Sequence, residues 1–197
     1  MKCAAAALAA AIALGCGGGQ AASEGTRKAR SDRPGGEPVE LTLRASDGSL
    51  LFVGDLKGQP VLMFLFATFD GVCQAALRPL GRFARAHSDV HVVGVAVQPD
   101  PEQLVEAYVH ALSPPFVVAH DPEERVGAGE TALGPVEGVP TYVMLDALGR
   151  LVARHEGYAS QRQLEHMLYR ARRAVPEEAA DAAGDPPPLL GNPDDSP

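Results

Sequence analysis

The sequence contains no tryptophan and only 3 cysteines among its 197 residues. It also lacks any run of the ~20 apolar residues that a membrane-spanning helix requires. The 17 basic side chains are outnumbered by 25 acidic ones, which argues against a general nucleic-acid binder because such proteins need clustered Lys and Arg. Pores, collagens and small disulfide-stapled proteins are excluded as well. The composition fits one folded domain of about 100–150 residues with appendages.

The N-terminal segment has the composition of an export signal. Lys2 supplies a positive charge, and an apolar stretch from Ala4 to Leu14 follows it. The run from Ala13 to Cys16 resembles a bacterial lipobox, in which the cysteine is lipidated and becomes the first residue of the mature protein. We therefore expect residues 1–15 to be a signal peptide and Cys16 to carry a lipid, with plain secretion as the alternative.

Two further segments are expected to stay disordered. Residues 16–38 are rich in Gly, Ser, Arg and Pro, which suits a linker between the lipid and the domain. Residues 174–197 hold six prolines, six acidic residues and no basic one, so this tail is expected to stay solvated or, alternatively, to recruit a basic partner. The lipid would hold the protein in a bacterial cell envelope, facing the periplasm or the exterior. Position 17 is Gly instead of the Asp that marks inner-membrane retention, which favours the outer membrane.

The cysteines are distributed so that one thiol remains in the domain. Cys3 would leave with the signal peptide and Cys16 would take the lipid, which leaves Cys73. An internal disulfide is therefore excluded in the mature protein, even though an extracytoplasmic compartment would permit one.

Residues 39–173 alternate strand and helix patterns, which predicts a layered α/β domain with parallel strand pairs. Two short strands around an Asp-Gly turn predict an N-terminal β-hairpin over 39–53, and the apolar run 61–66 is typical of a strand buried on both faces. Asp100 and Ser160 are expected to cap helices. Further strands are predicted at 90–97, 116–119, 141–145 and 151–155, and helices at 71–87 (kinked at Pro79), 101–112, 123–133 and 160–173.

Four motifs occur in a recognisable order. They are DLKGQPVL at 55–62, FATFDGVC at 66–73, GVPT at 138–141 and DALGR at 146–150. Together they resemble the TlpA/ResA-like branch of the thioredoxin superfamily, which shares the AhpC/TSA redoxin pattern. The resemblance covers most of residues 40–170. It implies a thioredoxin-like fold, with a central mixed β-sheet flanked by helices and the N-terminal hairpin as an extension.

The resemblance also implies an activity and a site. Members of this branch are extracytoplasmic thiol-disulfide oxidoreductases that act on partner proteins, often from a membrane tether. Pro140 matches a cis proline that faces the redox motif in the family. Phe69, Val139, Pro140 and Thr141 are accordingly expected to bind an extended partner segment. No nucleic acid is expected as a partner.

The sequence departs from the family at the centre of its motif. Asp70 stands where the family has its first, attacking cysteine, so C-x-x-C has become D-x-x-C, and Cys73 occupies the resolving position. Thiol-disulfide exchange needs a second thiol to resolve the mixed disulfide, so a two-thiol cycle within one molecule is excluded. Phe69 also replaces the usual Trp, and Ala76 an acid.

Asp70 and Cys73 each allow two interpretations. Asp70 fits a helix N-cap that accepts from the backbone N–H of Cys73, and alternatively a general base or metal ligand. The helix N-terminus lowers the pKa of a thiol at Cys73, whereas the Asp70 carboxylate and burial raise it. Cys73 is therefore an inert buried cysteine or a lone redox-active thiol.

No cofactor or metal site is expected. A copper chaperone of the Sco type would need C-x-x-x-C and a later His, and Phe69 stands where its first cysteine would be. The six histidines are all interpreted as surface residues; they are His87, His91, His110, His120, His155 and His166.

Three functions remain open after these observations. The first is a lipid-anchored thioredoxin-like protein whose redox chemistry is limited to the single thiol of Cys73. The second is a redox-inactive module of the same fold that binds extended protein segments. The third is a one-cysteine peroxidase, which is disfavoured because Asp70 replaces the Thr that precedes the peroxidatic cysteine by three residues.

Overall fold

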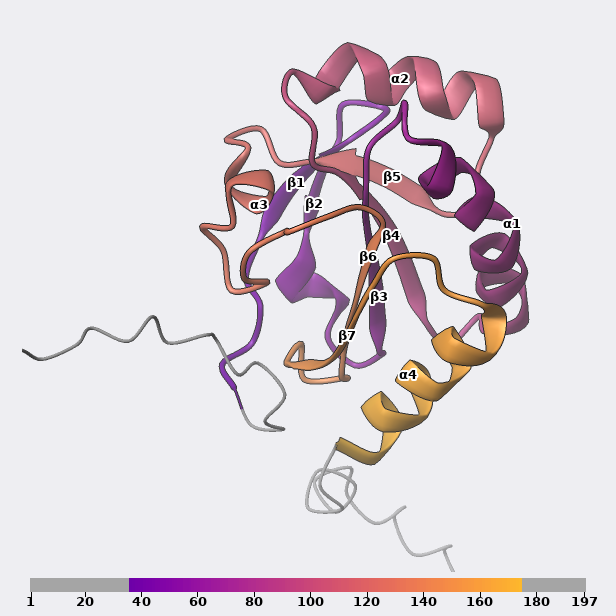
Figure 1. The fold of residues 1–197 in the computed structure, drawn as a ribbon. Helices are drawn as coiled ribbons and strands as arrows, with labels where there is room; N and C mark the ends of the chain where they lie inside the picture. Colours follow the sequence, from indigo (N-terminus) through magenta and orange to yellow (C-terminus); the bar gives the residue numbers. More distant parts are fainter. Residues whose placement is uncertain (1–35, 175–197) are drawn as a thin grey trace, which may run out of the picture.

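Strand β3 (Val61–Phe66) lies inside a seven-stranded mixed sheet with the order β2-β1-β5-β4-β3-β6-β7. The computed structural model describes residues 36–174 (Figure 1). β3 pairs in parallel with β4 and antiparallel with β6, and β4 pairs in parallel with β5. The other elements are β1 (Thr42–Ala45), β2 (Leu50–Phe52), the 3-10 helix η1 (Val53–Leu56), α1 (Gly71–Ala86), β4 (His91–Ala96), α2 (Pro101–Leu112), β5 (Val117–His120), α3 (Arg125–Ala128), β6 (Thr141–Leu145), β7 (Leu151–Glu156) and α4 (Gln161–Ala174).

All six residues of β3 are buried because the sheet is covered on both faces. Leu62, Phe64 and Phe66 join the core beneath α1, α2 and α4. The alternate residues of β3 join a second core, which the N-terminal hairpin and α3 complete. The uninterrupted apolar run therefore folds as predicted, and the two layers place the carboxyl end of β3 at one edge of the domain.

The folded part is slightly longer than the sequence indicates. Pro38 forms an isolated β-bridge with Arg150, and Ala174 is the last residue of α4. The predicted signal peptide, the lipid-bearing Cys16 and the tail from residue 175 onward lie outside the described residues. Within residues 36–174, no helix is both long and apolar enough to cross a membrane.

Two predicted helix starts have different outcomes. Ser160 caps α4 as expected: its hydroxyl oxygen accepts from the backbone N–H of Gln163 at 3.4 Å, and its own backbone N–H donates to Oε1 of Gln163 at 2.9 Å, which is a capping box. Asp100 precedes α2, but its side chain makes no capping hydrogen bond. Its backbone is left-handed, with φ of 48°, and its N–H donates to the Glu124 carboxylate. The helix therefore begins directly after Asp100, as predicted, but the Asp100 carboxylate does not cap it.

Two further predictions need correction. The helix expected over 123–133 spans only Arg125–Ala128, because Gly129 adopts φ of 76° and ends it with a left-handed cap. His120, expected at the surface, is 4% exposed at the end of β5, where β4 and β1 pair with it on both sides. Burial lowers the pKa of His120.

Candidate functional site

Three loops meet at one end of the sheet, beyond the carboxyl end of β3. The register pairs Thr141 with Leu65 of β3 and with Glu156 of β7. Pro140 therefore lies beside the loop 67–70 on one side and the loop 157–159 on the other. The backbone N–H of Gly157 donates to the carbonyl of Pro140 at 2.8 Å. The tertiary fold thus brings together three segments that are far apart in sequence.

Asp70 is the N-cap of α1, as predicted. Its backbone is extended, and its Oδ1 accepts a hydrogen bond of 2.7 Å from the backbone N–H of Cys73. This hydrogen bond is the largest influence that lowers the pKa of the Asp70 carboxyl. Asp70 is therefore a carboxylate at neutral pH, and one of its oxygens is engaged by the helix that it begins.

Cys73 lies in the first turn of α1 and has no exposed surface. Its side chain belongs to the core cluster that includes Phe66 and Tyr142. Burial, followed by the Asp70 carboxylate, raises the pKa of the Cys73 thiol from 9.0 to about 12, although a hydrogen bond from the backbone of Ala67 acts in the opposite direction. At pH 7 such a thiol is protonated. The opposing influences recognised in the sequence are thus decided in favour of a protonated thiol.

The loop before Asp70 is held by side chains that the sequence analysis did not single out. The backbone N–H of Thr68 donates to Oε1 of Gln98 at 2.7 Å, and Nε2 of Gln98 donates to the Thr68 hydroxyl at 2.8 Å. Gln98 is only 5% exposed. Gln74 donates to the Thr68 carbonyl from α1. No local pattern distinguishes Gln98 from a surface glutamine, because its partner lies thirty residues away in sequence.

The peptide bond between Val139 and Pro140 is cis, as the resemblance implies. Pro140 is buried and Val139 is half-buried against the core that contains Cys73. The hydroxyl of Thr141 donates to the Gly138 carbonyl at 2.7 Å, which closes the turn before β6. Thr141 was expected to bind a partner segment, but it is fully buried. Its role is therefore to hold the turn before β6.

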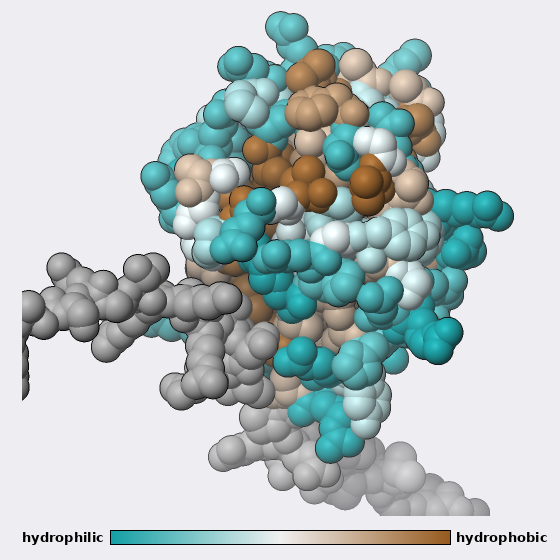
Figure 2. Space-filling view, viewed as in Figure 1, coloured by the Kyte–Doolittle hydropathy of each residue, from teal (hydrophilic) through white to brown (hydrophobic). Residues whose placement is uncertain are grey.

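Exposed hydrophobic side chains surround this end of the domain. Phe69, in the loop after β3, is 75% exposed, and Val72 in the first turn of α1 is 47% exposed. Tyr158, which follows the Gly157–Pro140 hydrogen bond, is 50% exposed. Figure 2 shows hydrophobic side chains gathered on the upper part of the visible face, below α2. We call Phe69, Val72 and Tyr158, together with the Val139–Pro140 bond, the apolar rim.

Among residues 36–174, no group of three His, Cys, Asp or Glu side chains is arranged to hold a metal ion. Asp70 has its capping hydrogen bond to Cys73 and no second acidic or His side chain is grouped with it in this range. This end of the domain therefore has a buried thiol, Cys73, beside the exposed side chains of the apolar rim.

Comparisons with known proteins agree on the family and the fold. The family model for Redoxin matches residues 22–168. Among curated protein sequences, none matches the chain. Many solved structures do match the chain.

Three solved structures illustrate the likeness. The exposed lipoprotein thioredoxin of Streptococcus pneumoniae is 22% identical, with a TM-score of 0.57 over 66% of this chain and 98% of that one. A thio-disulfide isomerase from Thermus thermophilus is 23% identical, with a TM-score of 0.57 over 69% and 95%. A secreted disulfide oxidoreductase of Mycobacterium tuberculosis is 19% identical, with a TM-score of 0.54 over 66% and 95%. The likeness establishes a thioredoxin-like fold.

Proposed function

The chain belongs to the Redoxin family, and on this premise we propose that it is a lipid-anchored protein of the bacterial cell envelope that binds extended protein segments at its apolar rim. In this proposal the D-x-x-C motif is a degenerate redox site. The protein keeps the fold of a thiol-disulfide oxidoreductase and uses it for recognition.

The replacement of the first cysteine supports this proposal. Asp70 stands at the position of the attacking thiol in the related family, and Cys73 is the free cysteine of the described residues. Thiol-disulfide exchange passes through a mixed disulfide that a second thiol resolves. Within this chain the domain holds no such second thiol, so a catalytic cycle would require an external one.

The state of Cys73 is the observation that carries the proposal. A thiolate is the nucleophile in disulfide exchange and in peroxide reduction. The Cys73 thiol has no exposed surface, and its pKa of about 12 keeps it protonated at neutral pH. Both the single-thiol oxidoreductase and the one-cysteine peroxidase need an accessible thiolate at this position, and they are disfavoured for that reason.

The apolar rim supports binding of an extended segment. Phe69 and Tyr158 present large apolar surfaces on two different loops, and Pro140 lies between these loops. An extended segment laid across the rim would bury apolar side chains on both flanks while its backbone faces the turn before β6. Exposed aromatic side chains are frequent anchors of such contacts because they bury much area at little entropic cost.

The proposed location follows from the lipobox-like run that ends at Cys16. Two of the structurally similar proteins are described as an exposed lipoprotein and as a secreted protein, which fits the same side of the membrane. The segment between Cys16 and the domain would act as the tether, and the outer membrane is the proposed destination. The partner would then be an extracytoplasmic protein.

Binding is tested with an unfolded protein that has no thiols, such as reduced and carboxymethylated lactalbumin. We expect Tyr158→Ser to weaken binding about tenfold, equivalent to ~1.4 kcal/mol. Tyr169→Ser is the matched control, because Tyr169 is 56% exposed on α4 and lies outside the rim. Cys73→Ala should leave the affinity unchanged. Equal losses in Tyr158→Ser and Tyr169→Ser would refute the role of the rim.

The thiol is tested separately by alkylation of a chain with Cys3→Ser and Cys16→Ser, which we call the single-thiol protein. Negligible alkylation of Cys73 below pH 9, with normal reactivity after unfolding, supports the binding module. Rapid alkylation of the folded protein with a midpoint below ~8.5, the ordinary value for a free thiol, would instead support the single-thiol oxidoreductase.

A further inference from the structure

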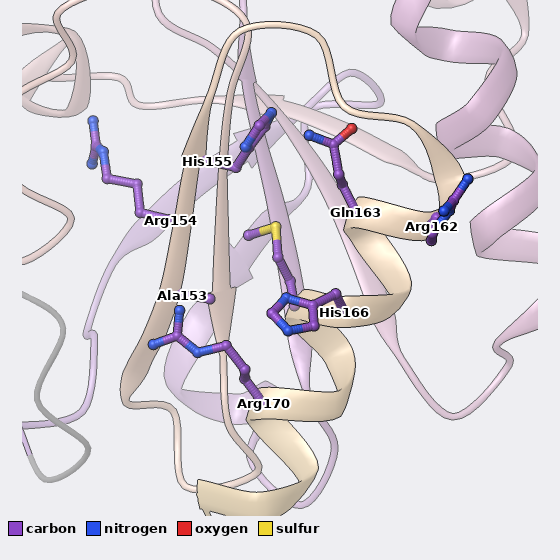
Figure 3. Close-up of a pocket in the computed structure, with 8 residues that line it drawn as sticks. Ala153, Arg154, His155, Arg162, Gln163, His166 and Arg170 are labelled. Carbon is purple, nitrogen blue, oxygen red and sulfur yellow. The ribbon is translucent and has the colours of Figure 1, made fainter.

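A cationic groove lies between β7 and α4, and it adjoins the apolar rim at His155, whose Nε2 lies 3.2 Å from the Tyr158 carbonyl. It has a volume of about 400 Å³. In Figure 3, His155 and Ala153 from the strand face Gln163, His166 and Arg170 from the helix across the gap. No residue of the apolar rim lines it. The full lining is Ala153, Arg154, His155, Arg162, Gln163, His166, Met167 and Arg170.

The charge of the groove is one-sided. Its lining includes three arginines and two histidines but no acidic side chain. Arg154 points to the far side of β7, where it pairs with Glu156 at 3.2 Å and donates to the Leu133 carbonyl. Arg162 and Arg170 have no ion pair within residues 36–174. Arg170 thus presents an unpaired charge toward β7, and Arg162 adds a second one at the edge of the groove, where its side chain extends away from the strand (Figure 3).

The sequence supplies such a partner directly after α4. The helix carries four arginines and one glutamate, whereas residues 175–197 carry six acidic side chains and no basic one. The point where this tail leaves the domain is fixed. Nη2 of Arg150 donates to the carbonyl of Ala174 at 3.1 Å, and the same guanidinium pairs with the fully buried Asp146.

We propose that the acidic tail, residues 175–197, folds back along α4 and places its carboxylates in the cationic groove. Pro176 disfavours continuation of α4, which in this proposal lets the tail turn back toward the helix. The groove is then occupied by a segment of the same chain, and the contact is made by Glu177, Glu178, Asp181 and Asp185.

The distances along the chain permit this contact. Arg170 lies four residues before the helix end, which is about 6 Å along the axis, and Arg162 lies about 18 Å away. The eleven residues from Ala174 to Asp185 span up to ~36 Å when extended. Glu177 and Glu178 can therefore turn back to Arg170, and Asp181 or Asp185 can reach Arg162. Tethering also raises the local concentration of the tail to the millimolar range.

The contact is tested by placing a nitroxide spin label in the tail of the single-thiol protein at Ala182→Cys. Cys73 is fully buried, and the same protein without Ala182→Cys should take up no label. We expect the amide signals of His155, His166 and Arg170 to lose more than half of their intensity in the nuclear magnetic resonance spectrum. Raising the salt from 0.1 M to 1 M, which shortens the Debye length from about 10 Å to about 3 Å, should restore most of it.

Charge reversal identifies the groove as the docking site. Arg170→Glu should abolish the broadening, and Arg85→Glu should leave it unchanged. Arg85 is the matched control because it is an arginine outside the groove. Its guanidinium lies near Gly81 of α1, beside Pro115. Absence of broadening in the parent protein would overturn the proposal. So would equal broadening in Arg170→Glu and in the parent, which would mean that the tail contacts another surface.

Inorganic phosphate at constant ionic strength separates the tail from small anions. If the tail occupies the groove, phosphate should shift the His166 signal only in a variant with Glu177, Glu178, Asp181 and Asp185 changed to their amides. An equal shift by phosphate in the parent protein would mean that the groove takes free anions and that the tail does not fill it.

Discussion

The carboxylate of Asp70 accepts a hydrogen bond of 2.7 Å from the backbone N–H of Cys73. The same carboxylate begins α1 and raises the pKa of the thiol three residues later. Asp70 thus acts as a helix cap, and its carboxylate adds to the burial that keeps the Cys73 thiol protonated.

Asp70→Asn should lower the pKa of Cys73 without making it reactive at neutral pH. The amide oxygen still accepts the capping hydrogen bond, but the negative charge beside the thiol is gone. Burial is the largest influence on Cys73, so its pKa should fall below about 12 yet stay above 9.0. The ultraviolet absorbance of the thiolate against pH, in the single-thiol protein, measures this. An unchanged pKa would mean that the Asp70 carboxylate does not influence the thiol.

The stability of the domain should fall in alkaline solution because of Cys73. The pKa of this thiol is raised from 9.0 to about 12 on folding, so below pH 9 both states hold the proton and the contribution is fully present. Between pH 9 and 12 only the folded state holds it, and the free energy of unfolding falls by about 1.4 kcal/mol per pH unit. Urea unfolding of the single-thiol protein and of its Cys73→Ala variant isolates this slope. Parallel pH profiles for the two proteins would contradict it.

Asp146→Ala should destabilise the domain by about 3–5 kcal/mol, because it leaves the partly buried Arg150 without its partner. Asp146 has no exposed surface; it accepts hydrogen bonds from the backbone of Leu148 and Arg150 and pairs with the Arg150 guanidinium at 2.7 Å. Asp47→Ala is the control, since Asp47 closes an exposed turn in the hairpin. Chemical denaturation should show a clearly larger loss for Asp146→Ala, and equal losses would count against the buried pair.

Gly127→Ala should destabilise the domain by about 1–3 kcal/mol through overpacking. A Cβ at Gly127 would lie 2.6 Å from the carbonyl oxygen of Val97, which the backbone cannot easily move. Gly71→Ala is the control, because Gly71 begins α1 and faces open space. A Gly-to-Ala change in a helix is favourable by up to about 1 kcal/mol. Thermal unfolding midpoints should therefore move in opposite directions, and a neutral Gly127→Ala would show that α3 can shift.

The sequence determined most of the fold because its signals are local. The six apolar residues of β3 require cover on both faces of the sheet, and the Pro101–Leu112 helix matches its predicted bounds. Asp70 was predicted as a cap from its position alone, because a cap and the N–H it binds lie three residues apart. The loss of a two-thiol cycle likewise follows from counting cysteines. In contrast, the helix predicted over 123–133 is short because of the left-handed Gly129, which packs against Pro135.

Only the tertiary structure decided the state of the thiol. The sequence places Cys73 at a helix N-terminus, which lowers the pKa of its thiol, and near the Asp70 carboxylate, which raises it. It does not show how deeply the thiol is buried. Burial depends on side chains from β3, β6, α2 and α4, which form one core cluster with Cys73. Their desolvation raises the pKa of the thiol by more than the backbone hydrogen bonds lower it. The roles of Gln98 and Tyr158, and the groove lined by Arg170 and His166, could likewise be identified only in the tertiary structure. Each is defined by contacts between segments that are distant in sequence, and residue spacing carries no record of such contacts.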